Sequence, residues 1–141
     1  MIDIQSIIIM ERKRNMSQNK ERMEFPIIYK VVSREDPTYA VGEVIRTQEN
    51  KAHMKIYPNT EGGPFAFIYC REKGQYEIPE VATEMLLKER VIDPHYQGIG
   101  LFLREKGLKY WDLWTLIEMD KGICSRDRFM IIREGMNYED S

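Results

Sequence analysis

The segment Ile27-Ile28-Tyr29-Lys30-Val31-Val32 carries the strongest β signal in the sequence. Branched and aromatic residues follow one another there, and such residues suit a pleated, half-buried strand. Pro26 precedes the segment, and the polar cluster 33–37 follows it as a turn. The sequence therefore predicts that the folded part of the chain begins near residue 25 and opens with a β-strand.

Two further strands are expected after this one. The second runs through residues 39–47, and the polar stretch 48–51 forms a hairpin loop. In the third, Met54 and Ile56 alternate with His53 and the other polar positions, so the apolar pair should face the core.

A fourth strand is predicted at Phe65-Ala66-Phe67-Ile68-Tyr69-Cys70. This segment is apolar at every position, which is typical of a central strand covered on both faces. The preceding residues 58–64 contain two prolines and two glycines and indicate a loop.

Three helices and a last strand complete the expected order. The first helix begins at Pro79, the second begins at Asp93-Pro94 and stops at Gly107, and the third ends at Gly122. The last strand covers residues 129–132. Helical spacing of apolar residues in the first helix predicts that its buried stripe contains Val81, Ala82, Met85 and Leu86.

Strands that are separated from helices along a chain indicate an α+β fold. We expect a mostly antiparallel sheet of about five strands packed against a cluster of three short helices. Residues 25–141 form this single domain, since a chain of 141 residues has enough material for one core. Residues 1–24 are mostly polar after a short isoleucine run and are expected to form an N-terminal arm.

The charge balance argues against a nucleic-acid-binding domain. The chain has 21 basic and 23 acidic residues, whereas domains that bind phosphate backbones usually carry a basic excess. The third predicted helix is also a poor DNA reader, because we expect it to expose Lys109, Asp112, Thr115 and Glu118 rather than a row of basic or amide groups.

The cysteines and the apolar runs argue against disulfide-rich, zinc-binding and membrane proteins. Cys70 and Cys124 are too few for a disulfide framework or a structural zinc site, so we expect a cytoplasmic protein without metal or cofactor. The apolar run at residues 7–10 is far too short to span a membrane, and we expect no membrane association.

The loop after the third strand is the first candidate site. Gly62 and Gly63 allow a ligand to approach the backbone closely, and His53, Tyr57 and Glu61 could converge beside them. A histidine next to a carboxylate can act as a general base. The simpler interpretation is a tight connection, with His53 and Tyr57 on the solvated face of a strand.

Four more residues are candidates for binding. His95 and Gln97 lie in the first turn of the second predicted helix, whose free N–H groups can bind an anion. Trp111 lies off the apolar stripe of its helix and is either a partly exposed anchor for a partner or the edge of the core. Arg126 precedes the last strand and could face an anionic ligand.

The leading hypothesis is a non-enzymatic binding or regulatory module. It would act on another protein or a small ligand, through its surface or a groove between sheet and helices. One alternative is a small hydrolase or transferase with His53 or His95 as base. A second alternative is a nucleic-acid-binding domain, which would need six basic residues to gather on one face: Arg71, Lys73, Lys88, Arg104, Lys106 and Arg126. The oligomeric state is left open.

Overall fold

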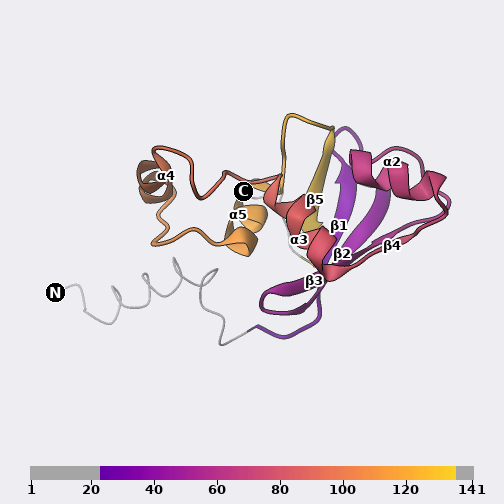
Figure 1. The fold of residues 1–141 in the computed structure, drawn as a ribbon, viewed down its shortest axis with the longest axis horizontal. Coiled ribbons are helices and arrows are strands. Elements are labelled where there is room, and N and C mark those ends of the chain that lie inside the picture. The colour runs from indigo at the N-terminus through magenta and orange to yellow at the C-terminus, as the bar shows by residue number, and fades with distance from the viewer. Residues whose placement is uncertain (1–22, 136–141) are drawn as a thin grey trace.

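A computed structural model of the chain describes residues 23–135 and contains a five-stranded sheet. The strands lie in the order β4-β3-β2-β1-β5, and all neighbouring strands are antiparallel (Figure 1). Their bounds are β1 Ile27–Ser33, β2 Ala40–Gln48, β3 Lys51–Ile56, β4 Glu77–Ile78 and β5 Phe129–Arg133.

The described residues also form four helices, and the predicted α+β class is confirmed. Within residues 23–135, no helix is both long and apolar enough to cross a membrane. The predicted N-terminal arm lies outside the described residues except for Met23 and Glu24, and Met23 packs against the core. The helices are α2 Phe65–Glu72, α3 Glu80–Lys88, α4 Ile99–Glu105 and α5 Leu113–Asp120.

One face of the sheet carries the core. Tyr29 pairs with Val44 across β1 and β2, and Val31 pairs with Ile131 across β1 and β5, so their side chains lie on the same face. Helices α2, α3 and α5 pack on this face, and α4 lies farther out, at the end of the molecule opposite α2 (Figure 1). Met54 on β3 is also buried there, as its alternation with His53 predicts.

The prediction of a strand at residues 65–70 is wrong, because this segment forms helix α2. In the helix only Phe67 is fully buried, whereas Phe65 and Tyr69 point outward and are exposed. An unbroken apolar run fits a buried strand and a helix equally well when only periodicity is considered. The sheet obtains its remaining strand from β4, where Ile78 pairs with Met54.

Two helix predictions also need correction. The second helix begins at Ile99 rather than at Asp93-Pro94, because the Asp93 carboxylate accepts the N–H of His95 and closes a turn. In α3 the fully buried residues are Thr83 and Leu87. Of the predicted stripe, Ala82 and Leu86 pack partly buried against the core, whereas Val81 and Met85 are exposed. Both sets of residues have helical spacing. Because Thr83 is polar, the sequence does not show that its side of the helix is buried.

Gly42 lets helix α2 lie close to the sheet. A Cβ atom at this position would be 2.7 Å from the Phe67 ring and would also meet the carbonyl oxygen of Lys55. The Phe67 side chain therefore uses space that only glycine leaves free on β2.

We predict that Gly42→Ala lowers the free energy of unfolding by about 1–3 kcal/mol, the usual cost of overpacking a core. The matched control is Gly100→Ala in α4, where an added Cβ has no atom within 4 Å. That change should stabilise the chain by about 0.5–1 kcal/mol, because alanine favours a helix over glycine. Urea unfolding of both variants measures the difference, and equal effects would contradict close packing at Gly42.

Candidate functional site

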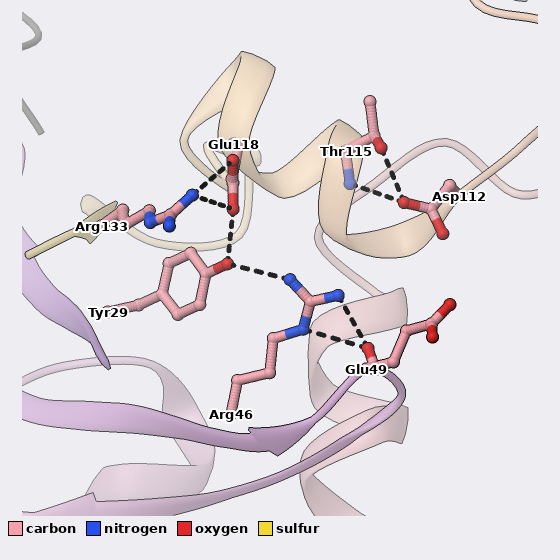
Figure 2. Close-up of polar contacts among 7 residues, drawn as sticks. All are labelled: Tyr29, Arg46, Glu49, Asp112, Thr115, Glu118 and Arg133. Carbon is pink, nitrogen blue, oxygen red and sulfur yellow. Dashed lines mark hydrogen bonds and ion pairs between the residues drawn. The ribbon is translucent and has the colours of Figure 1, made fainter. Parts of the chain in front are cut away.

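A connected group of polar side chains lies between the sheet and α5 (Figure 2). Arg46 on β2 is 0% exposed, and its Nε and one terminal nitrogen donate to the Glu49 carbonyl at 3.0 and 2.7 Å. Its other terminal nitrogen donates to the Tyr29 hydroxyl at 3.4 Å. The guanidinium also lies over the Trp114 ring, 4.5 Å from the ring centre.

Tyr29 links this guanidinium to a carboxylate on α5. Its hydroxyl donates to Glu118 Oε2 at 2.6 Å, and Arg133 on β5 forms an ion pair with the same oxygen at 3.4 Å (Figure 2). Burial raises the pKa of Tyr29 far above its ordinary value, and the negative charge of Glu118 raises it further. The phenol therefore stays protonated and donates, so the network holds α5 against the sheet.

The polar face predicted for the third helix is therefore partly wrong. Asp112 and Thr115 are buried, and the Asp112 carboxylate accepts the Thr115 N–H at 3.0 Å and its hydroxyl at 2.6 Å as the helix cap (Figure 2). The side chain of Glu118 is 14% exposed. The polar character of these three residues predicts exposure, but their side chains have hydrogen-bond partners in the interior.

We predict that Tyr29→Phe lowers the free energy of unfolding by about 1.5–3 kcal/mol, since a buried hydrogen bond to a charged group is lost. Tyr96→Phe is the matched control, because Tyr96 is exposed and the change should stay within about 0.5 kcal/mol. Chemical denaturation followed by fluorescence measures both values. A Tyr29→Phe protein as stable as the Tyr96→Phe protein would contradict the role of the network.

Helix α3 presents an apolar ridge to solvent, which we call the α3 ridge and define as Val81 and Met85. Their exposed fractions are 74% and 63%. The two residues are one turn apart, while Thr83 and Leu87 attach the opposite side of the helix to the core. The ridge is thus an exposed apolar feature on a firmly packed helix.

A cavity of about 280 Å³ lies between α2 and α3, and we call it the α2–α3 slot. Its floor is the sheet, with Met54 and Ile131 among the floor residues, and Phe65 and Leu86 belong to its walls. The Phe65 side chain is 79% exposed at this edge. The slot is therefore largely apolar, with buried core residues below and an exposed aromatic residue beside it.

A buried ion pair lines the polar end of the slot. Arg90 makes a bidentate pair with Asp127 at 2.7 and 2.9 Å and also donates to the carbonyls of Gly122 and Phe129. Burial alone would favour the protonated acid, but hydrogen bonds from Arg90 and from the Phe129 N–H hold the pKa of Asp127 below its ordinary value. The pair ties the loop before β5 to the end of α3.

The lowered pKa of Asp127 makes the free energy of unfolding depend on pH. Because its folded-state pKa is lowered, the ionised carboxylate stabilises the protein above the pKa of the unfolded chain, about 3.9. This contribution is lost as the pH falls through the lower folded-state pKa. We predict that Asp127→Asn is less stable near neutral pH and loses less stability between about pH 5 and pH 2. Denaturant midpoints across this range test it, and parallel curves for both proteins would contradict it.

A second cavity of about 330 Å³ lies on the other side of α3, and we call it the α3–α5 groove. Trp111 and Trp114 line it from the α5 side, and Val81 lines it from the ridge. The Trp111 indole N–H donates to the Ile92 carbonyl at 2.7 Å, which fixes the ring. The α3 ridge therefore stands between two cavities.

The structure places two of the predicted site residues at these cavities. Trp111 lines the α3–α5 groove and is partly exposed, and Trp114 is buried in the core. Arg126 lines the α2–α3 slot, where it forms an ion pair with Glu89 at 3.0 Å.

The remaining predicted residues lie elsewhere and do not form one site. His53 lies on the sheet face opposite the helices, and Tyr57 accepts a hydrogen bond from Lys30 at 2.8 Å on that face. His95 and Gln97 are exposed in the turns before α4. Within the described residues, neither histidine has a side-chain hydrogen bond to an acid or a nucleophile.

The glycine loop has a packing role in the structure. The Tyr39 hydroxyl donates to the Glu61 carbonyl at 2.8 Å and accepts the Glu61 N–H at 2.7 Å. Gly62 and Gly63 have φ angles of +77° and +109°, and a Cβ on Gly63 would lie 3.2 Å from Phe67. Left-handed backbone geometry here leads the chain into α2, as the simpler interpretation of this loop predicts.

The basic residues considered for a nucleic-acid surface are spread over several elements. Lys88, Lys106 and Arg126 each form an ion pair with an acidic side chain. Among residues 23–135, no group of three His, Cys, Asp or Glu side chains has the arrangement that a metal ion needs.

The sequence missed Val81, Met85 and Phe65 as surface residues. Thr83 and Leu87 have the same helical spacing as the exposed pair, but a threonine gives no apolar signal, so the local pattern does not reveal the α3 ridge. Comparison of the chain with protein-family models, with curated proteins and with solved structures finds no match.

Proposed function

We propose that this chain is a binding module that docks another protein on the outer side of α2 and α3. We call this region the α2–α3 surface and define it as the α3 ridge, the α2–α3 slot and the outward apolar residues of α2. The observation that carries the proposal is the exposure of five large apolar side chains on these two helices: Phe65, Ile68, Tyr69, Val81 and Met85.

Exposed apolar groups of this kind are typical of binding surfaces. Scattered apolar residues are common on any protein, but larger exposed apolar patches mark interaction sites. Of the five residues, Phe65 lines the α2–α3 slot and Val81 lines the α3–α5 groove. Aromatic residues and methionine are also enriched where proteins meet. Phe65 and Leu86 line the α2–α3 slot, so a partner side chain could enter it as an anchor.

The packing beneath the surface supports the same function. Phe67 holds α2 against Gly42, while Leu87 fixes α3 to the core. Arg90 and Asp127 fix the loop at the polar end of the slot. A docking surface built on rigid helices loses little conformational entropy when a partner binds.

Photo-crosslinking tests the proposal directly. We predict that a photoreactive amino acid at Met85 in the full chain, expressed in its native cell, captures a partner protein in high yield. Leu101 is the matched control, because it is an exposed apolar helix residue, 59% exposed, on the distant helix α4. Mass spectrometry identifies the product. Capture from position 101 as strong as from position 85, or no capture from either position, would contradict the proposal.

A further inference from the structure

We infer that the α2–α3 slot takes one uncharged aromatic side chain of the partner, an inference that rests on the proposed function and names the chemistry of the bound group. The ring would lie on the apolar floor of the slot, while the rest of the partner covers the α3 ridge. A charged side chain would be rejected, because each charged residue that lines the slot already has a partner of opposite sign.

The size of the slot matches a single ring. Its volume of about 280 Å³ exceeds the roughly 150 Å³ of an apolar cavity that holds benzene. Pockets for drug-sized ligands begin at about 300 Å³. The slot therefore has room for one large side chain, but it is too small for a drug-sized molecule.

The lining favours an aromatic ring. Phe67 lines the slot and is 0% exposed, and Phe65 stands at its edge, largely in solvent. Aromatic rings that contact one another gain more than the apolar area they bury, through edge-to-face and offset arrangements. Met54 in the floor adds a thioether sulfur, which makes favourable contacts with aromatic rings. A partner ring in the slot would have both kinds of neighbour.

The charged residues of the slot form two closed pairs. Arg90 and Asp127 are joined by two hydrogen bonds at 2.7 and 2.9 Å, and their side chains are only 7% and 13% exposed. Arg126 and Glu89 form the second pair at 3.0 Å, at the exposed rim. The described residues that line the slot thus include two acids and two bases, and each is paired within the slot itself.

This pairing sets the preference for an uncharged occupant. A charged side chain would lose water on entering the slot and would have to break one of the two pairs to gain an opposite charge. A hydrocarbon ring needs no such partner and is stabilised by leaving water. The slot therefore selects by charge as well as by size.

Three small molecules of similar size test the inference on the full chain: toluene, benzoate and benzylammonium. We predict that toluene shifts the methyl NMR signals of Met54, Leu86 and Ile131, which line the slot, and leaves those of Leu101 on α4 unchanged. Benzoate and benzylammonium should bind at least about tenfold more weakly, because each carries a charge that loses its water in the slot.

Glu89→Gln tests the role of the charge pairs. This change removes the partner of Arg126, so benzoate binding should rise about two- to fivefold, as expected for one exposed ion pair, while toluene binding stays the same. The matched control is Glu84→Gln, which removes an acid from the exposed pair with Lys88 at the α3–α5 groove. It should change benzoate binding by less than about twofold. Equal gains in the two variants would overturn the role of the pairs.

The captured partner provides a second test. The segment of the partner that is crosslinked to position 85 should contain a phenylalanine, tyrosine or tryptophan residue, and its change to alanine should weaken binding about tenfold or more. Leucine in its place should weaken binding less than lysine does, because leucine stays uncharged. A crosslinked segment without an aromatic residue would overturn the inference.

The outcomes separate this inference from the proposed function. If position 85 captures a protein but toluene leaves the methyl groups of the slot unshifted, or benzoate binds as tightly as toluene, the inference is overturned while the docking surface stands. If toluene binds in the slot but position 85 captures no protein, the docking surface is overturned, and the partner side chain with it.

Discussion

Arg46 places a guanidinium group in the interior between the sheet and α5, where it has no exposure to solvent. Such a group is costly to bury unless its N–H groups find acceptors and its charge is balanced nearby. The Glu49 carbonyl, the Tyr29 hydroxyl and the Trp114 ring meet these needs directly. Through Tyr29 the charge is also coupled to Glu118 on α5.

This requirement fixes the positions of the elements around it. Glu118 can reach Tyr29 and Arg133 only if α5 lies across β1 and β5, and the Trp114 ring then stacks on Tyr29 at 5.4 Å. With α5 in this position, Trp111 and Trp114 form one wall of the α3–α5 groove. The wall of the groove thus depends on a polar network that is buried between the sheet and α5.

The sequence predicts the strands better than the helices, and the reason is physical. Met54 and His53 alternate between buried and half-exposed positions, so a period of two identifies both the strand and its faces. Phe65–Cys70 has no such alternation, because the helix it forms buries Phe67 and leaves other apolar residues on the surface.

Only part of the candidate site can be predicted from the sequence. The sequence predicts Trp111 and Arg126, because an off-stripe tryptophan and a loop arginine are recognisable candidates for binding, and the structure places both at cavities beside α3. The helical spacing of Val81 and Met85 predicts a core position, because apolar residues at that spacing normally face the core. Their exposure follows from tertiary packing of Thr83 and Leu87, which no local pattern reveals.

Methyl NMR of the full chain, titrated with the partner protein that position 85 captures, tests the central claim most directly. The account predicts shifts at the methyl groups of Val81, Met85 and Leu86, with those of Leu101 on α4 unchanged. Shifts confined to Leu101, or to Ile28 and Ile45 on the opposite face of the sheet, would contradict the assignment of the α2–α3 surface as the binding site.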